Sequence, residues 1–210
     1  MNKSKIFIIF ILLFSFGTAI YFYPLLPEQL ASHWNAQGVV NGYMDRFWGL
    51  FLMPLLMLVF TALLFFLPKL DPERKNIEKF EGNFESFIVI FNLFLFYVYI
   101  LTVLWNIGYR INMITALMPA LAILFYFTGS LIGKAKRNYM IGIRFPWTLA
   151  SDVVWDKTHK IGEKLFKLTA IIAFLGTFFG QYAFWLLFIP LIASMIYLLV
   201  YSYLEYQKVK

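Results

Sequence analysis

Long apolar segments alternate with shorter polar segments along the whole chain. Six segments are long and apolar enough to predict membrane-spanning helices, because about 20 apolar residues on a helix cross the roughly 30 Å hydrocarbon core of a bilayer. These segments are 6–26, 47–67, 87–105, 113–132, 165–180 and 182–203. The last two come from an uncharged stretch between Leu168 and Tyr203, 36 residues long, with a tight turn expected at Gly180 and Gln181. The pattern predicts an all-α, polytopic membrane protein, with residues 1–210 forming a single bundle of six transmembrane helices.

The first apolar segment follows Lys3 and Lys5, as the apolar part of a signal peptide would. Its length and the lack of a small-residue cleavage site after it favour a retained helix. The bundle is therefore counted from this segment onward.

Basic residues fall almost entirely on one side of such a bundle. Sixteen of the 18 Lys and Arg residues lie on the side that holds both termini, and the other side carries only Arg46 and Arg110. Because basic loops remain on the cytoplasmic side of a membrane, both termini are predicted to be cytoplasmic. The net charge of +7 then reflects topology and attraction to anionic lipid headgroups, and not direct binding of nucleic acid.

The polar segment after the second span begins with a helix-start signature, an aspartate cap at Asp71 followed by proline. Ile77, Phe80 and Phe84 follow at helical spacing. This segment predicts a short interfacial helix that leads into the third span.

A second polar segment, 142–159, lies between the fourth and fifth spans and reads GIRFPWTLASDVVWDKTH. Pro146 predicts an extended backbone over 143–147, because the residue before proline disfavours the helical region. Ser151 is a good N-cap, so an interfacial helix is expected to start there and to be stabilised by an Asp156–Lys160 ion pair. Two roles are open for this segment: an elbow that orients two spans, or a docking surface for a soluble partner.

The polar segment between the first two spans contains His33, Trp34 and Asn35 together, followed by the turn formers Gly38, Asn41 and Gly42. Its residues have either a loop-packing role or a role in ligand contact. A metal site is disfavoured, because such a site needs three or four ligands and the only other histidine is predicted on the opposite side of the membrane.

The predicted spans have no acidic residue or arginine in their middle. Intramembrane proteases and ion-coupled transporters need ionisable groups there, so both classes are disfavoured and no enzyme activity is expected. Asn92 and Thr61 are expected to form interhelical hydrogen bonds, although Asn92 also leaves a small-amphiphile transporter open. The absence of cysteine excludes disulfides and thiolate chemistry, and no cofactor is indicated.

Two GxxxG pairs, Gly129/Gly133 and Gly176/Gly180, mark places where helix backbones can approach closely. They indicate either packing within one chain or a homodimer. The pattern alone does not separate these alternatives.

Together, the two polar segments resemble the SdpI family of bacterial membrane proteins and the domain of unknown function that accompanies it. The cytoplasmic part of the resemblance is carried by Asn138, Gly142, Arg144, Pro146, Trp147, Thr148, Leu149, Trp155, Thr158 and His159. The outer part is carried by HWNAQG and NG, which contain His33, Trp34, Asn35, Gly38, Asn41 and Gly42.

This resemblance implies an immunity protein that gives resistance to a secreted, membrane-active peptide toxin. The toxin would face the outer segment, and the cytoplasmic segment would dock a transcriptional repressor for signalling. The alternative is a transporter or exporter of a small amphiphile or lipid.

Overall fold

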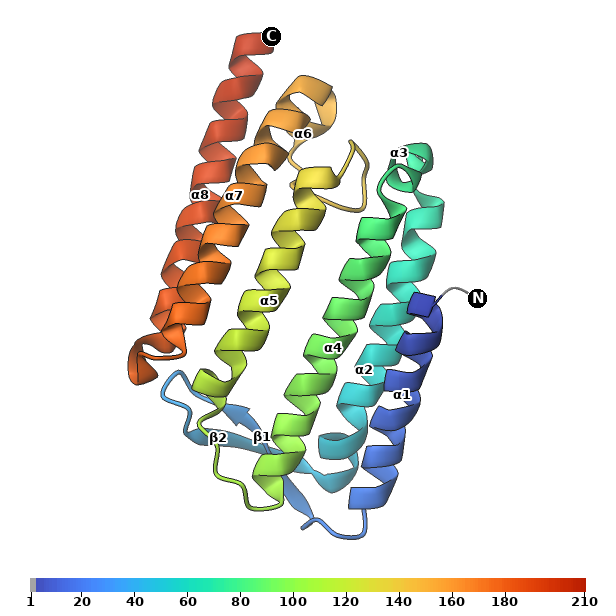
Figure 1. Ribbon diagram of the computed structural model, residues 1–210, viewed down its shortest axis with the longest axis vertical. Helices are drawn as coiled ribbons and strands as arrows, with labels where there is room; N and C mark the ends of the chain where they lie inside the picture. Colours follow the sequence, from blue (N-terminus) through green and yellow to red (C-terminus); the bar gives the residue numbers. More distant parts are fainter. Residues whose placement is uncertain (1–2) are drawn as a thin grey trace.

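Six long helices run up and down side by side in the computed structural model, which describes residues 3–210 (Figure 1). They are α1 (Lys3–Phe22), α2 (Arg46–Phe66), α4 (Glu81–Asn106), α5 (Met113–Lys134), α7 (Asp152–Gly176) and α8 (Ala183–Val209). Shorter elements connect them: strands β1 (Gln29–Trp34) and β2 (Val40–Asp45), helices α3 (Arg74–Glu78) and α6 (Pro146–Ala150), and 3-10 turns η1 (Leu67–Leu70) and η2 (Gly180–Tyr182).

The two ends of this bundle differ in what covers them. One end carries α3, α6, the loop 135–145 and the carboxyl end of α8, and we call it the basic end (Figure 1). The other carries the β1–β2 hairpin, and we call it the hairpin end. Successive long helices alternate in direction, so both chain termini point toward the basic end.

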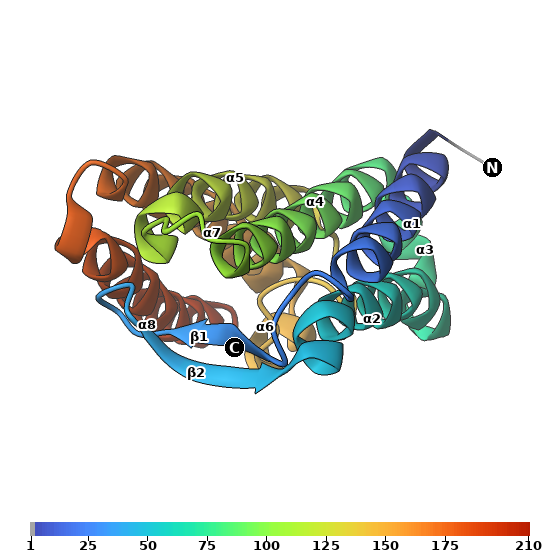
Figure 2. The same cartoon turned by 90° about the horizontal axis from the view of Figure 1, so that it is seen from below.

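Two groups of three helices make up the bundle. Helices α1, α2 and α4 pack together, as do α5, α7 and α8, and the groups meet where α4 lies along α5 (Figure 2). At the basic end both groups contribute to one apolar core that includes Ile8, Met57, Ile88, Leu131 and Trp155. A second core at the hairpin end belongs to the first group and the hairpin.

Five helical segments are long and apolar enough to cross a membrane: Lys3–Phe22, Arg46–Leu70, Glu81–Asn106, Met113–Lys134 and Gly180–Val209. The multi-span character expected from the sequence is therefore confirmed for five segments. The expected sixth span is the second half of α7, which is not among them. The first 16 residues of α7 include seven charged side chains, and only 168–176 is free of charge.

The all-α prediction missed the hairpin. β1 and β2 pair antiparallel from Gln29 opposite Asp45 to Ala31 opposite Tyr43, and the register shifts at His33. Side chains along β2 alternate between half-buried and exposed, which is the two-residue period of a strand with one covered face. The turn formers of this segment indicate the turn, but the alternation in β2 covers only six residues.

The interfacial helix predicted after Asp71 is shorter and more buried than expected. The Asp71 carboxylate accepts a hydrogen bond from the backbone N–H of Glu73 at 2.7 Å, and the helix α3 begins only at Arg74. Ile77 and Phe80 are 5% and 3% exposed and lie in the core of the basic end. Their helical spacing reflects contact with the bundle, and not with lipid.

Segment 143–147 is only partly extended. Phe145 is extended, but α6 starts at Pro146, because proline suits the first position of a helix, where no N–H bond is lost.

The predicted Ser151 cap is confirmed: its hydroxyl accepts from the Val154 N–H. The helix it starts is not a separate interfacial helix, since α7 continues to Gly176. The expected Asp156–Lys160 pair is wrong, and Asp156 instead lies 3.6 Å from Lys136 of the neighbouring loop.

The glycine pairs allow close packing within the chain. A Cβ at Gly129 would lie 3.0 Å from the Glu163 carbonyl of α7, and Gly133 also faces Glu163. Gly176 faces Ala183 of α8, whereas Gly180 faces open space. The homodimer stays a prediction, and the Gly129/Gly133 face is already occupied by α7.

Candidate functional site

The loop at the basic end is organised around Asn138, which is fully buried. Its Nδ2 donates to the carbonyls of Lys136 and Ile141 at 2.7 and 2.9 Å. Its Oδ1 accepts from the N–H groups of Met140 and Ile141 at 2.8 and 2.6 Å. One side chain thus satisfies four backbone groups of an irregular loop. These groups lack the backbone hydrogen bonds that a helix or a sheet would provide.

Gly142 brings this loop against α7. Its φ of 127° lies in the region that side chains other than glycine rarely adopt, and a Cβ there would lie 3.1 Å from the ring of Trp155. The same Cβ would overlap Nε2 of His159. A glycine is therefore required both by the backbone conformation and by the space available.

His159 and Trp155 form the surface that Gly142 meets. Their rings stack with centroids 3.9 Å apart, and Trp155 Nε1 donates to the Ala135 carbonyl at 2.9 Å. His159 Nε2 accepts from the Ile143 N–H at 2.9 Å, so the ring proton lies on Nδ1, which faces the Trp155 carbonyl at 2.8 Å. This is a neutral imidazole with both nitrogens used.

Burial lowers the pKa of His159 to about 4, because the protonated ring would lose its hydration, and the hydrogen bond to the Trp155 carbonyl and the charge of Asp156 offset this loss only in part. The side chain is 2% exposed. It therefore stays neutral at physiological pH and holds the loop through hydrogen bonds. Neither ring nitrogen is available to bind a metal or to move a proton.

The remaining motif residues close the turn into α6 and attach it to α8. Thr148 is fully buried, and its hydroxyl accepts from the Phe145 N–H at 2.8 Å. Trp147 Nε1 donates to the buried hydroxyl of Ser202 at 2.8 Å. Arg144 donates to the Tyr139 carbonyl, and its side chain is otherwise exposed. Thr158 is buried, and its hydroxyl has no partner within residues 3–210.

Three residues that are not among the predicted site residues join this loop to the turn before α3, to α3 and to the start of α7. Asp71 is 4% exposed and accepts from the Tyr139 N–H at 2.8 Å, and Asn76 donates to the Arg137 carbonyl at 2.8 Å. Arg137 pairs with Asp152 at 2.5 Å, and the hydrogen bond that Arg137 donates to this carboxylate raises the pKa of Arg137. No local pattern marks these pairs, because their partners are far apart in the chain.

At the hairpin end, Asn106 was also missed, although it anchors the hairpin to α4. Its Oδ1 accepts from the Ala31 N–H at 2.8 Å, and its Nδ2 donates to the Ala31 carbonyl at 3.0 Å. The amide thus pairs with β1 as a neighbouring strand would. Next to it, Trp34 packs edge-on against Trp105 with centroids 5.7 Å apart.

Within the hairpin, the predicted residues shape the turn. Asn35 accepts from the N–H groups of Gln37 and Val39, both at 3.0 Å. His33 Nδ1 lies 2.5 Å from Asn41 Oδ1, and Gly42 leaves room for the His33 side chain. Gly38 has a φ of 76°, and it also lies close to Asn112 at the start of α5.

A hollow of about 510 Å³ lies between the hairpin tip and the α4–α5 loop. Val39 and Tyr43, which are 59% and 62% exposed, lie on its hairpin side. The Arg110 guanidinium lies 3.9 Å from the Trp105 ring on its other side. This surface offers apolar, aromatic and cationic groups to a ligand, which suits binding of a peptide.

Groups that could support catalysis or transport are few in the described part of the chain. Residues 3–210 contain no cluster of three or more His, Asp or Glu side chains able to hold a metal ion. Asn92 is 1% exposed, accepts from the Thr61 hydroxyl at 2.9 Å and donates to the Ile88 carbonyl. The expected interhelical hydrogen bond between Asn92 and Thr61 is confirmed.

Comparison with known proteins identifies relatives of both polar segments. Residues 134–202 match the SdpI/YfhL protein family, and residues 10–58 match a domain of unknown function, DUF1648. The chain is 26% identical over 207 residues to the Immunity protein SdpI of Bacillus subtilis (strain 168), covering 98% of this chain and 97% of that protein. No solved structure matches significantly.

Proposed function

Because the chain belongs to the SdpI/YfhL family, we propose that it is a membrane immunity protein that gives resistance to a secreted, membrane-active antimicrobial peptide. The observation that carries this proposal is the similarity to Immunity protein SdpI along nearly the whole of both chains. That similarity includes the hairpin as well as the basic-end loop, so both surfaces belong to the proposed activity.

The proposed topology has six crossings in the cell membrane, with both termini in the cytoplasm. α7 supplies the sixth crossing beside α5 and α8, with its charged first half at the level of the cytoplasmic headgroups. Phe178, Phe179 and Tyr182 in the α7–α8 turn are 73%, 55% and 59% exposed, as expected for a turn that sits in the outer membrane interface. The excess of basic residues at the basic end supports the orientation.

In this orientation the hairpin faces the outside, where a secreted peptide arrives. The hollow beside Tyr43 and Arg110 is its proposed contact site, within a hairpin fixed by Asn35 and Asn106. The residues of this hollow are exposed aromatic and apolar side chains next to one cation. This composition suits binding of a peptide and requires no catalytic group. A transporter of small amphiphiles is the weaker alternative, since its motivating residue, Asn92, is buried, and both its Oδ1 and its Nδ2 already make hydrogen bonds within the bundle.

A signalling role would use the opposite end. Tyr139 and Val153 are 45% and 52% exposed there, beside Arg144 and Pro146, which are also exposed. These side chains, and not the buried members of the motif, would dock a cytoplasmic repressor. Replacing Arg144 should then abolish recruitment of the repressor while resistance persists.

The test is survival of a sensitive host that expresses the protein, challenged with membrane-active toxin peptides. Tyr43→Ser and Val39→Ser should lower resistance at an unchanged protein level, because they remove exposed contact groups only. Tyr139→Ser is the matched control, an exposed tyrosine at the opposite end, and it should keep resistance. No protection by the wild-type chain against any peptide would refute the immunity role, and equal loss in Tyr43→Ser and Tyr139→Ser would refute the hairpin site.

A further inference from the structure

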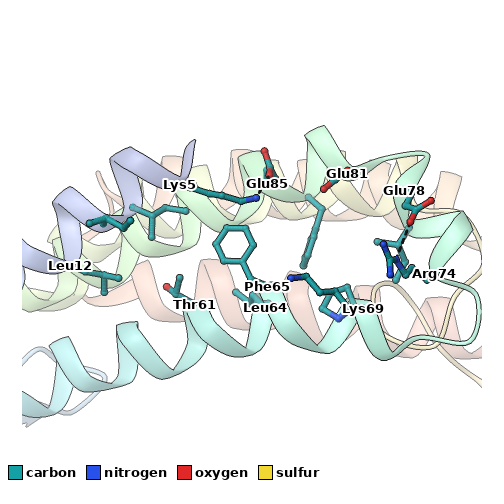
Figure 3. A pocket seen from close by; sticks show the side chains of 15 residues that line it. Lys5, Leu12, Thr61, Leu64, Phe65, Lys69, Arg74, Glu78, Glu81 and Glu85 are labelled. Carbon is teal, nitrogen blue, oxygen red and sulfur yellow. Dashed lines mark hydrogen bonds and ion pairs between the residues drawn. The ribbon is translucent and has the colours of Figure 1, made fainter. Parts of the chain in front are cut away.

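A second hollow, of about 450 Å³, lies at the basic end of the bundle, at the opposite end from the hollow beside the hairpin. It is lined by α1, α2, α3 and α4 (Figure 3). None of its lining residues belongs to the hairpin or to the 138–159 motif. Its deeper part is apolar, with Ile8 and Leu12 from α1 and Leu64 and Phe65 from α2. Thr61 lies at its inner end, where its hydroxyl is already bonded to Asn92.

The outer part of this hollow is charged and electrically balanced. Three cations and three carboxylates line it: Lys5, Lys69, Arg74, Glu78, Glu81 and Glu85. Two pairs are formed within the protein, Lys5 with Glu85 at 3.8 Å and Arg74 with Glu78 at 3.0 Å. Lys69 and Glu81 remain, and within residues 3–210 neither makes an ion pair or a side-chain hydrogen bond.

Lys69 and Glu81 come from opposite walls. Figure 3 shows Lys69 on the α2 side and Glu81 at the start of α4, with the apolar side chains Leu12 and Leu64 farther along the hollow. The arrangement is therefore one cation, one anion and an adjoining apolar channel. This is the complement of a molecule with a phosphate, an ammonium group and a hydrocarbon chain.

We propose that this hollow binds one phospholipid with a primary-amine headgroup, of the phosphatidylethanolamine type. The phosphate pairs with Lys69, the ammonium group donates to Glu81, and part of an acyl chain packs against Leu12 and Leu64. A lipid is the occupant because the hollow lies among helices that are apolar enough to span a membrane and its charged part is at their end. The proposal requires the membrane location but not the immunity role.

The charges of Lys69 and Glu81 also determine which lipid headgroup the hollow prefers. An anionic lipid such as phosphatidylglycerol offers Glu81 no cationic partner and brings a headgroup of net negative charge close to it. A choline headgroup has no N–H to donate to the carboxylate. Charge-assisted hydrogen bonds are strong enough for a preference of roughly tenfold for the primary amine.

The experiment is native mass spectrometry of the full chain in detergent, with phosphatidylethanolamine, phosphatidylglycerol or phosphatidylcholine of identical acyl chains added. We expect one retained phosphatidylethanolamine, bound roughly tenfold better than the other two. Leu64→Trp, which fills the channel, and Lys69→Glu should each lower this binding roughly tenfold. Glu81→Gln should remove the preference for the amine over phosphatidylglycerol.

Two matched variants serve as controls. Leu58→Trp adds the same ring on a part of α2 that is 46% exposed and outside the hollow, and Lys75→Glu reverses an exposed charge of α3 outside it. Both should bind as the wild type does. Equal binding of the three lipids by the wild type overturns the proposal, as does equal behaviour of Leu64→Trp and Leu58→Trp. If a variant does not fold, the unfolding temperature of the wild type is measured with each lipid. Phosphatidylethanolamine should raise this temperature more than the other two lipids do, and the absence of a larger increase also overturns the proposal.

Discussion

At the basic end, the loop 135–145 is held by the polar atoms of buried side chains, whereas the hairpin at the other end is held by the Asn106 amide, the Trp34–Trp105 pair and the packing of Leu30 in the apolar core. Asn138, His159 and Asp71 each use their polar atoms on backbone groups of the loop. The hairpin instead leaves Val39 and Tyr43 largely exposed. Both segments carry family motifs, but their side chains are used differently.

This difference separates motif residues that build the fold from those that remain able to bind. A buried asparagine or histidine with all its atoms paired is costly to lose and has nothing left to offer a ligand. Exposed aromatic side chains contribute little to folding and are typical of binding surfaces. Substitutions at the basic end should therefore lower stability, and substitutions at the hairpin tip should lower resistance.

The largest effect is expected from Gly142→Ala. The backbone conformation at φ 127° costs roughly 1–3 kcal/mol for a residue with a Cβ. The methyl group also displaces His159 and leaves the Ile143 N–H unpaired, which adds roughly 1–3 kcal/mol. Thermal unfolding in detergent should show a large loss. Gly82→Ala, where a Cβ meets open space, is the control and should unfold as the wild type does.

A slightly smaller effect is expected from acid. The pKa of His159 is lowered from 6.5 to about 4, so below pH 6.5 the unfolded chain takes up a proton that the folded protein does not. The contribution of His159 to the free energy of unfolding is fully present above pH 6.5. It falls as the pH is lowered and levels off below about pH 4. The total loss is about 3 kcal/mol. His159→Gln keeps an acceptor for Ile143 and should flatten the decline in unfolding temperature between pH 6.5 and 4; a slope like that of the wild type would contradict this account.

Asn106→Leu tests the anchor of the hairpin. It leaves the N–H and C=O of Ala31 without partners, and Ala31 is 1% exposed, so the cost is roughly 2 kcal/mol. Limited proteolysis should cut the hairpin faster than in the wild type, and resistance should fall with it. Thr102→Val, which removes a hydroxyl one turn earlier in α4, is the control. A hairpin as protected in Asn106→Leu as in the control would show that the apolar contacts of Leu30 and the tryptophan pair suffice to hold it.

The smallest effect is expected from Trp147→Phe, which removes the donor to Ser202 and keeps most of the ring contact with Tyr203. The loss should be about 1 kcal/mol in the free energy of unfolding, because one hydrogen bond of ordinary strength disappears. Resistance should not change. A loss of resistance at normal protein level would show that the basic end does more than support the fold.

Features set by neighbours along the chain were predictable. The Ser151 cap, the turn formers around Asn35 and five of the apolar segments depend on residues a few positions apart or on local hydropathy. The predictions that were wrong concern competition between local rules. Proline started α6 and did not keep Trp147 extended, and the charged first half of α7 continues without a break into its apolar second half.

The amino-acid sequence by itself determined that this is a polytopic helical protein with its basic residues gathered on one side, because hydropathy, capping and charge act over short separations. Only the tertiary structure decided which polar residues meet. Asn106 bonds to Ala31 across 75 residues, and Asp71 bonds to Tyr139 across 68. Such pairs depend on how helices pack, since a buried backbone group accepts whichever partner the neighbouring element brings within hydrogen-bond distance.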